Sequence, residues 1–155
     1  MDILLWRHAE AVDLHEEQPD DMLRPLSPRG IKQAQRMAKW LDQHLPERTR
    51  ILCSPAIRCV STVQSLQRKY KTCPELAPDG DAQTALALAQ WLHARTPVLI
   101  VGHQPMLGQM VAQLLGLADH GLSVRKGSVW WLRNRIRLET QHNIVHCVQS
   151  PDMLW

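Results

Sequence analysis

The apolar run at residues 97–101 (PVLIV) constrains the fold of this chain more than any other feature. A short, continuous apolar run of this kind is typical of a strand that is covered on both faces. Two further short runs, 2–6 (DILLW) and 50–53 (RILC), have the same character. Residues 128–133 and 143–149 are predicted to form a hairpin near the edge of the sheet. The chain is therefore expected to fold around a buried central sheet.

Helical segments alternate with these strands. Ser27 and Pro28 are typical of an N-cap followed by proline in the first helical turn, and Pro46 ends that helix. One face of the helix is predicted to be apolar, with Ile31, Ala34, Met37, Ala38, Leu41 and Leu45. Further helices are predicted at 54–70, 82–94 and 105–116. This alternation favours a three-layer α/β sandwich with a mostly parallel central sheet flanked by helices, in one domain over residues 1–155.

The composition is that of a globular protein, 45% hydrophobic and 21% charged, with a formal net charge of +3. That small excess does not by itself indicate nucleic-acid binding, although it suits a site that attracts an anion. No apolar run approaches the roughly 18 residues of a membrane span, and the N-terminal stretch does not resemble a signal peptide. The four cysteines form no CxxC pair, and no disulfide is expected. We expect a monomeric, cytoplasmic protein with no nucleic-acid or membrane partner.

Residues suited to chemistry stand directly after the predicted strands. Arg7 and His8 follow the first strand, Ser54 and Arg58 follow the second, and His103 follows the 97–101 strand. In parallel α/β sheets, ligands bind beyond the carboxyl ends of the strands. Arginine side chains and the starts of helices both suit phosphate. Each of these residues alone has an ordinary structural explanation, but their coincidence at strand ends predicts a phosphate site.

Three stretches at these positions carry a family resemblance. Residues 4–10 (LLWRHAE), 53–62 (CSPAIRCVST) and 101–105 (VGHQP) are similar, in order and spacing, to the motifs of the histidine phosphatase, or phosphoglycerate mutase-like, superfamily. Within it, the chain most resembles the small phosphohistidine phosphatases called SixA. Further similarity to that group lies at 24–27, 74–76 with Gly80 and Asp81, and 149–151. The resemblance covers nearly the whole chain.

The resemblance implies a role for each matching residue. His8 would attack phosphorus and carry the phosphoryl group, for which the attacking nitrogen must be unprotonated. Arg7, Arg58 and His103 would hold the phosphoryl oxygens, and His103 would add positive charge if protonated. Arg24 and Ser54 are further candidates for substrate binding. No cofactor is implied, and no HxH or HExxH spacing indicates a metal.

The chain departs from the family pattern at two positions. Ala9 stands where the first motif usually has glycine, a change expected to be tolerated if the backbone angle there is ordinary. Gln104 stands where some members have an aspartate that protonates the leaving group. In other members that acid lies in the loop after the second helix, and the candidates there are Glu75, Asp79 and Asp81, with Glu10 as a further candidate outside that loop. The sequence does not choose among these carboxylates.

A chain without this acid would suit phosphohistidine, because the leaving nitrogen is far less basic than an alkoxide. The sequence therefore predicts a phosphohistidine phosphatase that acts on a histidine-phosphorylated protein, and the SixA resemblance implies a phosphorelay domain as partner. One alternative is a phosphomonoesterase for a small metabolite or sugar phosphate. Another is a non-catalytic phosphate-binding module, which the nucleophile His8 disfavours. The stretch between Arg58 and His103 leaves little chain for a lid, which disfavours a mutase.

Overall fold

The computed structural model describes residues 1–118 and 122–154. Its six strands form one sheet in the order β3-β2-β4-β1-β5-β6. The strands are β1 (Asp2–Arg7), β2 (Arg50–Cys53), β3 (Lys71–Thr72), β4 (Val98–Gly102), β5 (Val129–Arg137) and β6 (Thr140–Gln149). The strands β1 to β4 are parallel to one another, whereas β5 is antiparallel to β1 and β6 is antiparallel to β5. This confirms the mostly parallel sheet and the hairpin at its edge, while the two-residue strand β3 was not predicted.

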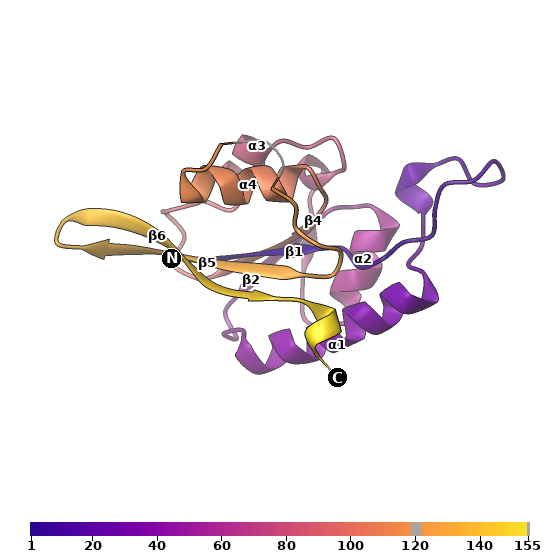
Figure 1. Cartoon of the computed structure of the whole chain (residues 1–155), viewed down its shortest axis with the longest axis horizontal. Coiled ribbons are helices and arrows are strands. Elements are labelled where there is room, and N and C mark those ends of the chain that lie inside the picture. Colours follow the sequence, from indigo (N-terminus) through magenta and orange to yellow (C-terminus); the bar gives the residue numbers. More distant parts are fainter. Residues whose placement is uncertain (119–121, 155) are drawn as a thin grey trace.

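Helices cover both faces of the sheet, as the sequence predicts (Figure 1). The helices are α1 (Pro28–His44), α2 (Ile57–Gln64), α3 (Ala82–Leu88) and α4 (Met106–Leu115). Successive strand residues point to opposite faces, so Leu4 and Leu99 pack with α1 and α2, whereas Ile3 and Ile100 pack with α3 and α4. The α/β three-layer sandwich is therefore confirmed, with one apolar core on each side of the sheet.

The helix ends are determined by local hydrogen bonds and backbone angles. Two of the predicted helices are shorter in the structure than the sequence suggested. Ser27 caps α1 by accepting a hydrogen bond from the Gly30 amide at 3.0 Å, as its position predicts. The predicted 54–70 helix spans only Ile57–Gln64, and the predicted 82–94 helix spans only Ala82–Leu88. Gln67, Gln90 and Leu92 have φ of 55°, 54° and 70°, angles that an α-helix does not accept.

The apolar face predicted for α1 is buried, with one exception. Ala34, Met37, Ala38 and Leu41 are inaccessible or nearly so. The prediction for Ile31 was wrong, because this side chain is 47% exposed. It lies in the first turn of α1, where the buried position is that of the preceding residue, Gly30.

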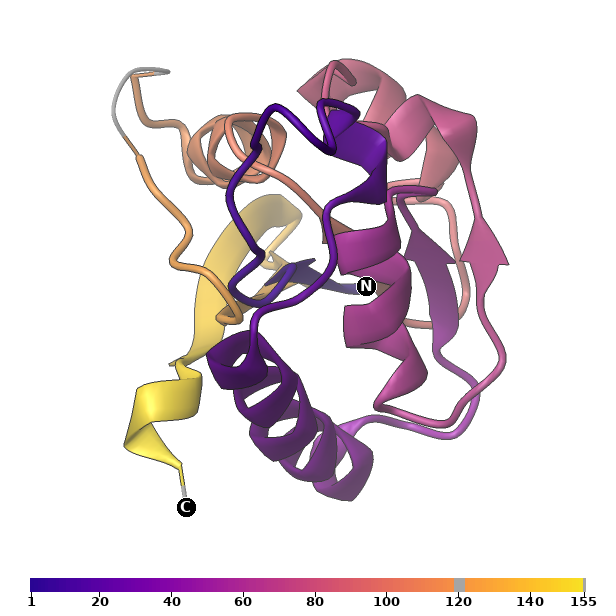
Figure 2. The ribbon, with the colours of Figure 1, turned by 90° about the vertical axis from the view of Figure 1, so that its right-hand side faces the viewer.

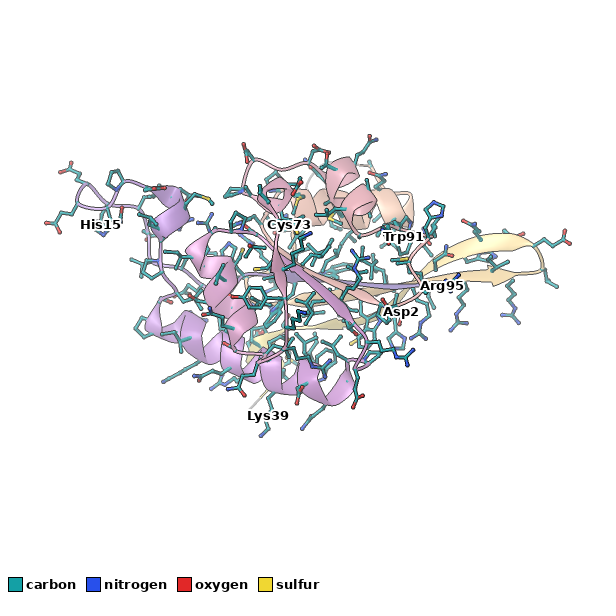
Figure 3. The ribbon with its side chains drawn as sticks, turned by 180° about the vertical axis from the view of Figure 1, so that it is seen from behind. Asp2, His15, Lys39, Cys73, Trp91 and Arg95 are labelled. Atoms are coloured by element: carbon teal, nitrogen blue, oxygen red, sulfur yellow. The ribbon has the colours of Figure 1, made fainter. Side chains whose placement is uncertain are left out.

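Two segments extend from opposite ends of the sheet. Residues 11–26, hereafter the outer loop, lie beyond the carboxyl ends of the parallel strands and pass in front of the sheet in Figure 2. The β5–β6 hairpin extends from the other end. Figure 3 shows His15 at the tip of the outer loop, far from Asp2 and Arg95 beside the hairpin. Within the described residues, no helix is long and apolar enough to span a membrane.

Candidate active site

The two predicted histidines follow neighbouring strand ends. Arg7, the last residue of β1, pairs in register with Gly102, the last residue of β4. The His8 amide then donates to the Gly102 carbonyl at 3.1 Å, which extends the pairing one residue past β1. This register places the His8 and His103 rings with centroids 5.2 Å apart. Both side chains are buried, with 6% and 2% exposure.

A pocket of about 270 Å³ opens at this edge of the sheet. It is lined by Arg7, His8, Ala11, Arg24, Arg58, Pro78, His103, Gln104 and Lys126. The fold therefore brings together every predicted phosphate-binding residue except Ser54, which contacts His103 but does not line the pocket. A larger hollow of about 420 Å³ lies along the β2–β3 edge, away from these strand ends, and no described histidine lines it.

His8 is held as a neutral imidazole. Its Nδ1 lies 2.7 Å from the Ala9 carbonyl oxygen, which accepts only from a protonated nitrogen, so Nε2 is left with the free lone pair. Burial and the charges of Arg58, Arg7 and Arg24 together lower the pKa of His8 to about 4, although the hydrogen bond to the Ala9 carbonyl opposes them. At neutral pH the side chain is therefore unprotonated at Nε2, as nucleophilic attack requires.

Ala9 fits the position where the family motif usually has glycine. Its side chain is fully buried, and its φ is not among the positive values found in the described residues. Its amide donates to Thr62 Oγ1 at 3.1 Å, and the Thr62 hydroxyl donates to the Arg58 carbonyl at 2.7 Å. These bonds tie the backbone that follows the nucleophile to helix α2.

Two pocket arginines have donors without partners. Arg7 donates through Nη1 to the Val124 carbonyl at 2.8 Å. Arg58 donates through Nη1 to the Asp21 carbonyl at 2.6 Å and through Nη2 to Asp21 Oδ2 at 2.9 Å. The Nε atoms of both arginines are buried and have no partner. Leaving a buried donor unsatisfied costs about 1–3 kcal/mol, which a bound oxyanion would recover.

His103 is fixed by Ser54, which directly follows β2, and by Cys59 in the first turn of α2. Its Nε2 lies 2.7 Å from Ser54 Oγ and 3.3 Å from Cys59 Sγ. The pKa of His103 is lowered to about 3, mainly by burial, with His8 in its protonated form and the charge of Arg58 acting in the same direction. His103 is therefore neutral in the empty pocket, and a phosphoryl dianion beside it would favour its protonation. Ser54 acts on the pocket through this contact rather than by lining it.

Arg24 reaches the pocket from the outer loop. Its Nε donates to Asp21 Oδ1 at 2.9 Å and its Nη1 to the Val12 carbonyl at 3.2 Å. Sequence reasoning missed Asp21, whose carboxylate joins Arg24 and Arg58. Its spacing three residues before Arg24 is a signal for that pair, but nothing local in the sequence indicates the contact with α2.

Lys126 is a second lining residue that sequence reasoning missed. It lies in a turn whose next residue, Gly127, donates its amide to the carbonyls of Arg7 at 3.1 Å and His8 at 3.0 Å. Gly127 has φ of 76°, and a Cβ there would lie 3.0 Å from Pro151 Cγ. The conformation thus favours glycine, and the Lys-Gly pair is the only local signal for this turn.

The four candidate acids do not line the pocket. Glu75 and Asp79 are exposed. Asp81 caps α3 by accepting from the Thr84 amide at 2.8 Å, and these hydrogen bonds hold its pKa below the usual range. Glu10 accepts from the hydroxyl that caps α1 at 2.8 Å. None of the four therefore lines the pocket, including Glu10, which is engaged at the base of the outer loop.

Gln104, which stands where some family members have aspartate, has both ends of its amide engaged. Its Oε1 accepts from the Gly108 amide at 2.7 Å, and its Nε2 donates to the Leu122 carbonyl at 3.0 Å. A carboxylate could not make the second bond, because it has no donor when ionised. Gln104 therefore fixes the start of α4 against the segment after it.

Together these groups form a neutral nucleophile among cationic donors, an arrangement suited to binding and transferring a phosphoryl group. Within residues 1–118 and 122–154, no cluster of three or more histidine, cysteine or acidic residues could hold a metal ion.

Comparison with known proteins indicates the same kind of chemistry, phosphoryl transfer. Residues 3–80 match the model of the histidine phosphatase superfamily, branch 1. The chain is 31% identical over 122 residues to the phosphohistidine phosphatase SixA of Escherichia coli, and the matched region covers 74% of each chain. The solved structure of the protein histidine phosphatase SixA complexed with tungstate superposes with a TM-score of 0.75 at 25% identity, covering 99% of each chain. A phosphoserine phosphatase from Entamoeba histolytica shares the fold, with a TM-score of 0.73 at 15% identity and 99% coverage of each chain.

The chain therefore belongs to the histidine phosphatase superfamily, branch 1, and it is a phosphatase, a hydrolase similar to the SixA proteins.

Proposed function

We propose that the protein is a phosphohistidine phosphatase that removes the phosphoryl group from a histidine-phosphorylated protein through a phospho-His8 intermediate. His8 Nε2 attacks phosphorus, and the P–N bond of the substrate breaks. The substrate imidazole, protonated on its second nitrogen, leaves as a neutral ring with the electron pair of that bond. Water then attacks phospho-His8, and inorganic phosphate, a proton and neutral His8 result.

The hydrogen bonding of the Gln104 side chain is the observation that supports phosphohistidine as the substrate. Its amide is committed to Gly108 and Leu122, so this position supplies no proton to a leaving group. An alkoxide leaving group needs such a proton, whereas an imidazole that already carries a proton on its second nitrogen leaves as a neutral ring without one. The similarity to the SixA phosphohistidine phosphatase of Escherichia coli supports the same substrate class.

A protein substrate is supported by the chain between α2 and β4. That segment forms only β3, a short 3-10 helix at Pro74–Leu76 and the seven-residue helix α3. Little chain is therefore available to close over the pocket, and a side chain on a folded domain could reach His8. A phosphorelay domain that carries its phosphoryl group on histidine is the partner that we propose.

Phosphate release from a histidine-phosphorylated phosphorelay domain, measured beside p-nitrophenyl phosphate with EDTA present, tests this function. We expect fast release from the domain, weak ester hydrolysis, and no release from either substrate by His8→Ala. A preference for the ester would overturn the proposal in favour of a phosphomonoesterase. Phosphate binding without turnover would favour a non-catalytic binding module.

A series of aryl phosphates adds a second readout. Without protonation of the leaving group, kcat/KM should fall steeply as the pKa of the leaving phenol rises. A flat dependence would mean that an acid acts in the pocket, and it would contradict the role given to Gln104.

A further inference from the structure

A single carboxylate joins two of the pocket arginines. Asp21 begins the short 3-10 helix Asp21–Leu23 in the outer loop. Its Oδ2 accepts from Arg58 Nη2 at 2.9 Å, its backbone oxygen from Arg58 Nη1 at 2.6 Å, and its Oδ1 from Arg24 Nε at 2.9 Å. Asp21 itself does not line the pocket.

These contacts determine which part of the Arg58 guanidinium remains for a ligand. A guanidinium presents an end edge with two Nη atoms and a side edge with Nε and one Nη. Asp21 occupies the end edge with its carbonyl and its carboxylate. The Nε atom on the side edge is buried and has no partner. Because Arg58 lines the pocket and its end edge is occupied, the side edge is the part of the guanidinium left for a phosphoryl group.

We propose that Asp21 is a positioning residue for phosphoryl transfer, which holds the side edge of Arg58 toward the phosphoryl group and fixes Arg24 beside it. The proposal rests on the roles given above to His8 and Arg58. Asp21 touches neither the substrate nor the nucleophile, so it acts through the two arginines. Because a small misplacement of a clamping group can lower a rate by about a hundredfold, its loss should reduce turnover strongly.

Charge gives Asp21 a distinctive signature. Partial burial would raise the pKa of this carboxyl, but the hydrogen bond and charge of Arg58, followed by those of Arg24, outweigh burial and leave the pKa below its usual range. The group is therefore anionic at neutral pH. Removing its charge makes the pocket more positive, which favours binding of phosphate, while the loss of orientation lowers the rate of transfer. A loss of structure alone would weaken both.

Asp21→Asn is the test, with Asp20→Asn as the matched control. Asp20 is the adjacent exposed carboxylate, it contacts the Met22 amide at 2.9 Å, and asparagine can make the same contact. Both variants lose one negative charge at nearly the same place, but only Asp21 contacts Arg58. We expect kcat for a histidine-phosphorylated domain to fall at least tenfold in Asp21→Asn and less than twofold in Asp20→Asn.

Inhibition constants separate positioning from a structural role. For Asp21→Asn we expect inhibition by inorganic phosphate to stay within threefold of wild type or to tighten. Inhibition by vanadate, which imitates the five-coordinate transition state, should weaken at least tenfold. Asp21→Glu, which keeps the charge, should recover part of kcat. Thermal unfolding of each variant shows whether it is folded.

Three outcomes would overturn the proposal. They are a kcat for Asp21→Asn within twofold of wild type, an equal loss in Asp20→Asn, or a parallel loss of phosphate and vanadate inhibition. If wild-type protein does not release phosphate in a His8-dependent way, the proposed function fails. The phosphate and vanadate constants can still be measured in that case by direct binding, so the two failures are distinguishable.

Discussion

The strand ends and the outer loop contribute to the same pocket in different ways. Arg7, His8 and His103 stand within one residue of β1 or β4, and backbone hydrogen bonds in the sheet register fix them. Arg24 reaches the pocket from the outer loop, whose base is closed by the bridge between Ala11 and Leu26. Residues 12–17 of that loop are all exposed.

This difference separates two tasks. The nucleophile must stay neutral and in place, and a buried strand end satisfies both conditions. The outer loop carries charges that adjust the electrostatics and orientation of groups fixed elsewhere. We therefore expect substitutions at strand ends to remove catalysis, and substitutions in the outer loop to reduce it by degrees.

His8→Ala, at the end of β1, should abolish turnover, because His103, the other neutral imidazole that lines the pocket, has its Nε2 engaged by Ser54 and Cys59. Rapid acid-free quenching of the wild-type reaction should trap a phosphoryl group that is stable in alkali and labile in acid, as phosphohistidine is. His8→Ala should show neither the trapped group nor turnover. A trapped group that persists in the variant would place the nucleophile elsewhere and contradict the role given to the end of β1.

Arg58→Ala should lower kcat/KM by about a hundredfold to a thousandfold, because a buried charged donor aimed at a developing oxyanion contributes on the order of 3 kcal/mol. Arg58 is 3% exposed and contacts both regions, through Thr62 to the strand end and through Asp21 to the outer loop. Arg58→Lys keeps the charge but has no side edge, so it should recover little activity. Full recovery by lysine would mean that charge alone matters at this position.

Sequence reasoning succeeded at the strand ends and failed in the outer loop for a physical reason. A strand end is defined by local pattern, since an apolar run predicts the strand and the parallel sheet brings its end to the shared edge. Asp21 contacts Arg58 across 37 positions of sequence, and no local periodicity encodes that contact. Lys126 was missed because its turn is held by the carbonyls of Arg7 and His8, which are farther still from it in the sequence.

Helix lengths show the same limit on a smaller scale. The predicted helices at 54–70 and 82–94 contain residues with ordinary helical propensity, but Gln67 and Gln90 adopt positive φ and end them early. Glutamine has no local preference for that conformation. The starts of α1 and α3 were predicted well, because the side chains of Ser27 and Asp81 cap their own helices locally.

Acid should destabilise the protein through the strand-end histidines. The pKa of His8 is about 4 when folded and about 6.5 when unfolded, so between these values the unfolded chain binds more protons. The free energy of unfolding should therefore fall as pH decreases from about 6.5 to 4, by on the order of 3 kcal/mol from His8 alone.

Urea unfolding of the wild type and His8→Ala at several pH values checks this. The pH dependence should be smaller in His8→Ala over that window. His15→Ala, which removes a histidine from the exposed tip of the outer loop (Figure 3), should keep the wild-type pH dependence. Equal pH dependence in wild type and His8→Ala would contradict the assignment of a buried neutral His8.

Arg24→Ala should have the smallest of these effects, about a tenfold loss in kcat/KM, because a partly exposed charge is screened by water and contributes little more than 1 kcal/mol. Arg24 is 22% exposed and lines the pocket from the loop alone. The loss should appear mainly in KM, since Arg24 adds charge to a pocket whose reacting groups remain in place. A loss as large as that of Arg58→Ala would mean that the outer loop shares in catalysis as fully as the strand ends, and the division between the two regions would not hold.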